Sequence, residues 1–130
     1  MIVDASAILA ILLEEPERDA MGEALAIDAR GHEMSPVNYL EAAVRVDRWP
    51  APGKSAQLDP LMAELGIRIT TVTPEQATLA RAAYQKFGRG NHPARLNLGD
   101  CFAYALAKAR NEPLLFKGDD FRLTDVEAAL

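Results

Sequence analysis

Short apolar segments alternate with helical segments along this chain, and this alternation restricts the possible folds more than any other feature of the sequence. Residues 1–3 and 113–117 are short and apolar, and residues 67–73 are rich in β-branched side chains, so we expect strands at these three places. Strands that are separated by helices usually pair in parallel, through right-handed crossovers. The pattern therefore predicts an α/β fold in which helices cover a mainly parallel sheet.

Cap residues and the spacing of apolar side chains mark the helices. Ser35 and Thr73 each precede a proline, which indicates two helix starts, and at the second of them Gln76 is expected to reach back to the cap. Residues 5–13 are too apolar to face water. The helices that we expect after them cover residues 18–30, 36–48, 55–65, 74–87 and 97–111, and Thr124 is expected to cap a last short helix.

Length and composition indicate a single domain that covers residues 1–130. Apolar residues make up 49% of the chain and charged residues 25%, which is ordinary for a globular protein and argues against disorder. No apolar run approaches the roughly 18 residues of a membrane span, and the first residues lack the basic leader of a signal peptide. We therefore expect a cytoplasmic location and no membrane partner.

The chain has one cysteine and two histidines, and none of the three is expected to carry chemistry. A single cysteine, Cys101, excludes an internal disulfide and a cysteine zinc site. It has no basic partner nearby in the sequence, so an inert core thiol is favoured over a nucleophile. His32 and His92 lie in expected loops without a second ligand at metal-binding spacing, and we expect surface roles for both.

The formal net charge of −5 limits the ways in which this chain could bind nucleic acid. Proteins that bind nucleic acid without sequence preference usually carry a basic surface, because neutralisation of phosphates supplies most of their affinity. A chain of this charge would need a local basic patch or bound metal ions to act on such a partner.

Several carboxylates stand at the ends of expected strands and near the starts of expected helices. Asp4 ends the first strand, and Asp119 and Asp120 follow the last one. Asp100 lies in the first turn of a mostly apolar helix, and Glu41 lies near the start of another. In an open parallel sheet, functional sites form outside the carboxyl ends of the strands, so these acids can converge at that edge.

Acids that gather at one edge would repel one another unless a cation lay between them. Mg²⁺ and Mn²⁺ prefer hard oxygen ligands, and such ions support the hydrolysis of phosphodiesters. Each acid also has an ordinary explanation, because a first-turn acid complements the helix dipole and aspartates are common in turns. On spacing alone, both interpretations remain open.

Four stretches of the chain carry a resemblance to a known family. In chain order they are MIVDASA (1–7), SPVNYLE (35–41), RLNLGDCFAYALA (95–107) and LLFKGDDF (114–121). Together they resemble the PIN-domain ribonucleases, and specifically the VapC-type toxins of type II VapBC toxin–antitoxin pairs. The resemblance implies a PIN-like three-layer α/β/α fold. It also implies a metal-dependent endoribonuclease that hydrolyses RNA phosphodiester bonds and is neutralised by a cognate VapB-type antitoxin.

The resemblance implies catalytic and metal-binding roles for the acids. By position, Asp4 and Asp100 match the principal ligands for Mg²⁺ (or Mn²⁺) in this family, and Glu41 matches its third acid. The fourth acid falls in the turn after the last strand, where Asp120 is favoured and Asp119 is the alternative.

Polar and basic residues near these acids have implied supporting roles. Ser6 matches a small hydroxyl that orients the first aspartate, and Asn38 matches a polar neighbour of the site, although a helix cap and a solvated side chain explain them equally well. The basic residues that we expect to flank the cleft are Arg45, Lys86, Arg89, Arg95 and Lys117. Of these, Arg89 and Arg95 are favoured for contacts with RNA phosphates.

The resemblance also bears on partners. Residues 5–13 and the helix from Arg18 carry more apolar surface than one stripe needs, which suggests a groove for an amphipathic segment of the antitoxin. The family further suggests a homodimer.

A catalytically inactive PIN-fold binding module stays open as the alternative function. Phosphatase and receiver domains fit badly, because no acid follows Asp4 at the spacing of two and no central strand ends in an aspartate.

Overall fold

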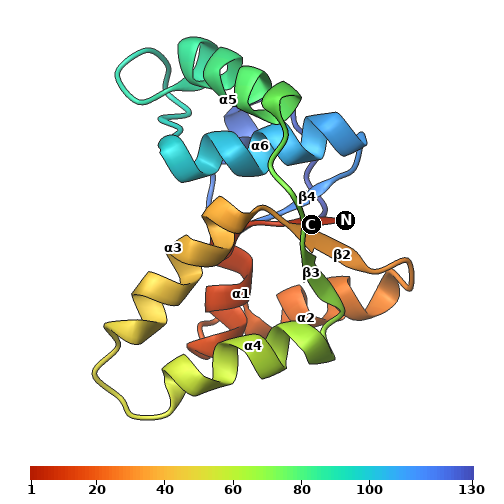
Figure 1. Cartoon of the computed structure of the whole chain (residues 1–130), viewed down its shortest axis with the longest axis vertical. Helices are drawn as coiled ribbons and strands as arrows, with labels where there is room; N and C mark the ends of the chain where they lie inside the picture. Colours follow the sequence, from red (N-terminus) through yellow and green to blue (C-terminus); the bar gives the residue numbers. More distant parts are fainter.

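Four short parallel strands form the middle layer of the computed structural model, which describes residues 1–130 (Figure 1). The strands are β1 (Ile2–Val3), β2 (His32–Met34), β3 (Ile67–Ile69) and β4 (Leu114–Leu115), and they lie in the order β3-β2-β1-β4. Every neighbouring pair is parallel. The predicted α/β fold with a mainly parallel sheet is confirmed.

Helices cover both faces of this sheet (Figure 1). On one face lie α1 (Ala5–Leu12), α2 (Arg18–Ile27), α3 (Pro36–Asp47) and α4 (Lys54–Glu64), and on the other lie α5 (Pro74–Phe87) and α6 (Leu98–Arg110). A 3₁₀ helix, η1 (Asp120–Leu123), follows β4. The three-layer arrangement that the resemblance implied is therefore present. A bilayer crossing would need a longer and more apolar helix than any that this fold contains.

The neighbouring strands β1 and β4 are buried on both faces. Ile2 and Leu114 belong to the hydrophobic core beneath α5 and α6, whereas Val3 and Leu115 belong to the core beneath the other four helices. Neighbouring side chains of a strand point to opposite faces, so each of these two-residue strands contributes to both cores. All four side chains are at most 1% exposed, which explains why both strands are continuous apolar runs in the sequence.

The predicted helix starts are confirmed. Ser35, Thr73 and Asn97 each accept a backbone N–H of the first turn that follows them. Asn97 also forms a capping box with Asp100, whose carboxylate accepts the Asn97 N–H. The reach of Gln76 back to its cap is not observed. Its side chain is buried, and its Nε2 has no hydrogen-bond partner.

Several elements differ from the predictions. The strand β2 was not expected, because His-Glu-Met has no β-branched residue; its pairing with β1 and β3 makes it a strand. The strand predicted over residues 67–73 ends at Ile69, and the helix predicted over residues 18–30 ends at Ile27. The last short helix precedes Thr124 instead of following it, since the Thr124 N–H and hydroxyl both donate to the carbonyl of Phe121 and close the 3₁₀ turn.

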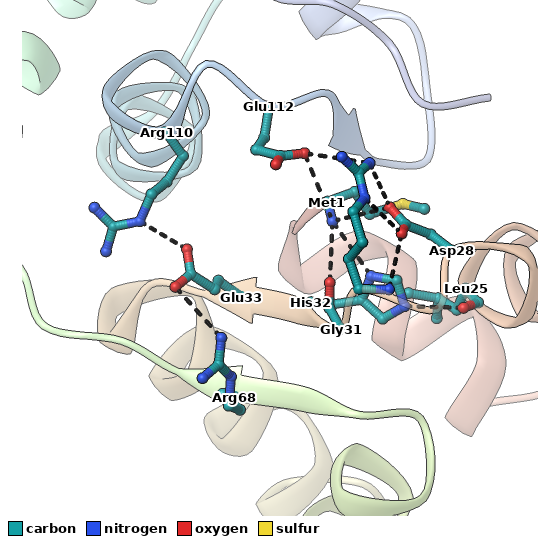
Figure 2. Close-up of polar contacts among 10 residues, drawn as sticks. Met1, Leu25, Asp28, Gly31, His32, Glu33, Arg68, Arg110 and Glu112 are labelled. Atoms are coloured by element: carbon teal, nitrogen blue, oxygen red, sulfur yellow. Dashed lines mark hydrogen bonds and ion pairs between the residues drawn. The ribbon is translucent and has the colours of Figure 1, made fainter.

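A polar network occupies the amino ends of β1 and β2, at the opposite end of the strands from the predicted site (Figure 2). The Met1 ammonium lies 3.5 Å from the Asp28 carboxylate. His32 is 2% exposed, and its Nε2 lies 2.9 Å from the Leu25 carbonyl oxygen, so Nε2 carries the proton. The predicted surface role of His32 is wrong, because β2 places this residue in the interior. His92 is half-buried in its loop and accepts a backbone N–H.

Candidate active site

Asp4 lies at the carboxyl end of β1 and inside the protein. It is 5% exposed, and its Oδ2 accepts the Ser6 backbone N–H at 3.0 Å and the Ser6 hydroxyl at 2.6 Å. The Ser6 oxygen in turn accepts the Lys117 backbone N–H at 3.0 Å, which ties the segment after β4 to Asp4. Burial raises the pKa of Asp4, and the hydrogen bonds from Ser6 offset this only in part. This geometry supports the orienting role implied for Ser6.

Asn38 joins three segments at the same edge of the sheet. Its side chain is fully buried. The Asn38 Nδ2 lies 2.8 Å from Glu41 Oε1, 3.0 Å from the Gly99 carbonyl oxygen and 3.5 Å from Asp4 Oδ1. These acceptors belong to α3, to the first turn of α6 and to the end of β1. Asn38 therefore connects Glu41 and the start of α6 to Asp4.

Asp100 stands in the first turn of α6 with one oxygen engaged in the capping box. The side chain is half-buried, and burial first, followed by the charges of Asp4, Glu41 and Asp120, raises its pKa to about 7. Burial also raises the pKa of Glu41, with a further contribution from the Asp4 charge. The four site acids (Asp4, Glu41, Asp100 and Asp120) are therefore close enough to repel one another.

No basic side chain forms an ion pair with the four site acids. Every ion pair of the structure is made by other carboxylates. Nowhere in the structure do three His, Cys, Asp or Glu side chains lie close enough together to enclose a metal ion. Mg²⁺ needs no such cage, because one or two carboxylates with waters and substrate phosphates suffice to hold it. A set of uncompensated carboxylate oxygens is a donor set that fits Mg²⁺ or Mn²⁺.

An open groove of about 680 Å³ runs beside the acids. Residues from α1, α3 and the start of α6 line it: Asp4, Ala5, Ser6, Leu9, Val37, Leu40, Glu41, Val44, Arg45, Arg48, Leu98 and Asp100. Arg45 and Arg48 are exposed and supply the positive charge of the groove. Leu40 and Leu98 are apolar side chains that are 61% and 73% exposed. The groove thus combines carboxylates, guanidinium groups and apolar surface.

The remaining predicted site residues lie outside this groove. Asp120 is exposed at the start of η1 and acts on Asp100 through its charge. Asp119 lines a separate cavity and is not among the charges that raise the pKa of Asp100, which favours Asp120 as the fourth acid. Arg89 and Arg95 are exposed in the loop before α6 and do not line the groove. Their contacts with RNA stay predictions.

Arg48 and Gly99 were not predicted as site residues. Arg48 could have been found from its spacing, because it follows Glu41 by about two helical turns and Arg45 follows Glu41 by about one, so the three share one face of α3. No local signal marks Gly99, whose importance depends on a side chain from another helix. Lys117, which was expected to flank the cleft, has its Nζ paired with carboxylates of residues 15 and 17.

Cys101 follows Asp100 but takes no part in the site. The thiol is buried, and burial together with the Asp100 charge raises its pKa to about 11. A thiol with this pKa stays protonated at neutral pH and is a poor nucleophile. The predicted inert core thiol agrees with this environment.

The fold is that of a known class of protein. Residues 1–127 match the family model described as the PIN domain, and the chain belongs to the PIN-domain family. It is 50% identical to the protein named Ribonuclease VapC28 of Mycobacterium tuberculosis, over 100% of this chain and 98% of that protein. It is 45% identical to Ribonuclease VapC of Mycolicibacterium smegmatis, over 98% of both chains. These relatives place it among the VapC ribonucleases of the family.

The fold also has a counterpart among solved structures. The crystal structure of Mycobacterium tuberculosis VapC20, described as a sarcin–ricin loop cleaving toxin, matches with a TM-score of 0.77 over 96% of this chain and 95% of that one. The sequence identity is 13%, so this likeness supports the fold alone.

Proposed function

We propose that this chain is an endoribonuclease toxin that hydrolyses RNA phosphodiester bonds and depends on Mg²⁺ or Mn²⁺. The observation that carries the proposal is the set of four site acids, none of them in an ion pair, three of which line an open groove. The relatives support the same activity, because proteins 45% and 50% identical to this chain over nearly its full length are named ribonucleases.

Asp4 and Asp100 are proposed as the principal ligands that hold the cation together with waters and substrate phosphate, with Glu41 as the third acid and Asp120 as the fourth. When bound, a divalent cation supplies an acidified water nucleophile and positive charge for the phosphodiester. Ser6 keeps the Asp4 carboxylate oriented through its hydroxyl and its backbone N–H. The raised pKa of Asp100 reflects burial and repulsion, so a cation that neutralises the site favours its ionised form.

Basic residues are proposed to bind the RNA backbone on either side of the acids. Arg45 and Arg48 lie in the groove and are the nearest candidates for the phosphates that flank the cleaved bond. Arg89 and Arg95 are proposed to contact RNA beyond the groove, since both are exposed in the loop that leads to α6. Such local contacts allow an acidic protein to bind RNA despite its net charge of −5.

A cleavage assay with the purified chain, a defined RNA and MgCl₂ tests this function. Asp100→Asn and chelation by EDTA are each expected to reduce cleavage by about 10²-fold or more, because a ligand matters at least as much as the residues that orient it. Asp19→Asn is the matched control, since Asp19 is also a first-turn acid but is exposed in α2. Mapping of RNA ends after induction in cells then identifies the target.

The cleavage assay, together with a test of growth arrest in cells, separates the two candidate functions. If Asp4→Asn and Asp100→Asn cleave RNA at the rate of the unaltered chain, the proposed site is wrong. If both variants lose cleavage but still arrest growth, the toxicity does not depend on catalysis, and a PIN-fold binding module is favoured instead.

A VapB-type antitoxin is proposed as the protein partner. A cavity of about 350 Å³ between α1 and α4 is lined by apolar side chains that include Ile11, Leu12 and Leu61 and by charged side chains that include Glu14, Arg18 and Lys54, a combination that suits an amphipathic segment. Affinity purification of the tagged chain from its own cells, compared with a Leu61→Asp variant, tests this. Ile27→Asp is the control, because Ile27 is 83% exposed and lies outside the cavity. Recovery of the unaltered chain alone, soluble and monomeric, would count against an antitoxin bound at this cavity.

A homodimer and a cytoplasmic location also belong to the proposal, on the strength of the family. Sedimentation of the purified chain measures the first, and fractionation of its own cells measures the second.

A further inference from the structure

The Glu41 carboxylate lies directly over the Cα of Gly99. A Cβ built at residue 99 would overlap with the Glu41 Cδ and with both carboxylate oxygens. Gly99 belongs to the first turn of α6, and its φ is not in the left-handed region, so the backbone does not require glycine there. The Glu41 carboxylate fills the space that a side chain at residue 99 would need.

Asn38 fixes the same carboxylate by a hydrogen bond. Its Nδ2 has two protons and two short contacts, at 2.8 Å to Glu41 Oε1 and at 3.0 Å to the Gly99 carbonyl oxygen. All neighbours of Nδ2 are acceptors, which settles which end of the amide is the nitrogen. The Asn38 Oδ1 is buried without a partner, an arrangement that costs stability. The position of Asn38 therefore serves the two groups that its Nδ2 contacts, the Glu41 carboxylate and the Gly99 carbonyl.

We propose that Asn38 and Gly99 are positioning residues that set where the Glu41 carboxylate lies relative to Asp4. This inference rests on the proposed function, because it concerns the cation that the acids would bind. The Asn38 amide lies between the two acids, at 2.8 Å from Glu41 Oε1 and 3.5 Å from Asp4 Oδ1. Two carboxylates repel each other, and the partial positive charge of the amide NH₂ group between them allows both to stay near one cation site.

The variant Gly99→Ala distinguishes positioning from a purely structural role. Alanine is a better helix former than glycine, and the atoms that its Cβ would meet belong to the movable end of Glu41. The variant is therefore expected to fold with its Glu41 carboxylate displaced, because the helix propensity of alanine offsets part of the lost hydrogen bond between Asn38 and Glu41. Loss of a residue that orients a metal ligand typically weakens metal binding by about 10–100-fold, and we expect this range for Mn²⁺.

Titration of the RNA-free protein with MnCl₂, followed by electron paramagnetic resonance of the free ion, measures this effect. Gly22→Ala is the matched control, because Gly22 is also helical and a Cβ there meets nothing within 4 Å. Asn38→Ala is the second variant and is expected to weaken Mn²⁺ binding in the same range. In a Glu41→Ala background, Gly99→Ala is expected to have no further effect, since the carboxylate that it displaces is absent.

Two results of the Mn²⁺ titrations would overturn the inference. One is Mn²⁺ affinity in Gly99→Ala equal to that of Gly22→Ala; the other is an equal loss of affinity on adding Gly99→Ala to Glu41→Ala. Metal-free crystals of Gly99→Ala give a separate readout, and a Glu41 carboxylate still bonded to Asn38 in them would also overturn it. The proposed function fails by a different result, namely an Asp100→Asn variant that cleaves RNA normally.

Discussion

Replacement of Asp100 by asparagine is expected to stabilise the metal-free protein while it removes activity. Asp100 is half-buried near Asp4, Glu41 and Asp120, and burial together with their charges raises its pKa from 3.8 to about 7. Asparagine keeps an oxygen that can accept the Asn97 N–H, so the capping bond survives. The substitution therefore removes a charge that folding disfavours and leaves the local hydrogen bonding in place.

The magnitude follows from the two pKa values of Asp100. A change from 3.8 to about 7 corresponds to at most about 4 kcal/mol, at about 1.36 kcal/mol per pH unit, and solvent screening at a half-buried position reduces this to about 2 kcal/mol. The folded chain holds the proton more tightly than the unfolded chain. The contribution of Asp100 to stability is therefore largest below pH 3.8, falls as the pH rises, and is lost above a pH of about 7.

Urea unfolding in the absence of metal, between pH 4 and pH 8, is the assay. Asp100→Asn is expected to exceed the unaltered chain in free energy of unfolding by about 2 kcal/mol at pH 8, with a gain that shrinks towards pH 4. Asp19→Asn, the exposed first-turn control, should show no gain, because its charge favours the helix by about 0.3–1 kcal/mol. Added Mn²⁺ should stabilise the unaltered chain more than Asp100→Asn. An Asp100→Asn protein that is less stable at pH 8 without metal would refute the reasoning.

Ser6→Ala removes the hydroxyl that links Asp4 to the segment after β4. We expect the free energy of unfolding in urea to fall by about 1–3 kcal/mol and Mn²⁺ binding to weaken. No change in either quantity would contradict the role of Ser6. Joint replacement of Arg45 and Arg48 by alanine should weaken RNA binding and flatten its salt dependence in filter-binding assays without a change in Mn²⁺ affinity. Arg68→Ala, at the amino end of the sheet, is the control, and equal losses in both proteins would place the RNA elsewhere (Figure 2). Leu106→Ala, at a fully buried position of α6, should lower the free energy of unfolding in urea by about 2–5 kcal/mol. A decrease below about 1 kcal/mol would show that the core beneath α5 and α6 is loosely packed.

The parts of the fold that depend on local chemistry could be predicted from the sequence. Ser35, Thr73 and Asn97 cap helices through bonds to residues two or three positions away, so their patterns are visible in the chain itself. The strand β2 could not be predicted, because its residues become a strand through pairing with strands distant in the sequence. The same pairing buries His32, which its neighbours in the sequence give no reason to expect.

The candidate site divides in the same way. Asp4 and Asp100 stand where a strand ends and a helix begins, and such positions at the carboxyl edge of a parallel sheet can be recognised from the sequence. Gly99 could not be recognised, because the need for glycine arises from a carboxylate on another helix. The bond from Asn38 to the Gly99 carbonyl is likewise a contact between residues 61 positions apart, which only the folded chain brings together.

Anomalous diffraction from crystals soaked in MnCl₂ tests most directly whether the site acids hold a divalent cation. We expect an anomalous peak within about 2.0–2.6 Å of carboxylate oxygens of Asp4 and Asp100, the range of distances that hard divalent cations keep to oxygen ligands. Asp100→Asn crystals should lose that peak. Full RNA cleavage by a protein that shows no Mn²⁺ at these acids under saturating conditions would contradict a metal-dependent site at this edge of the sheet.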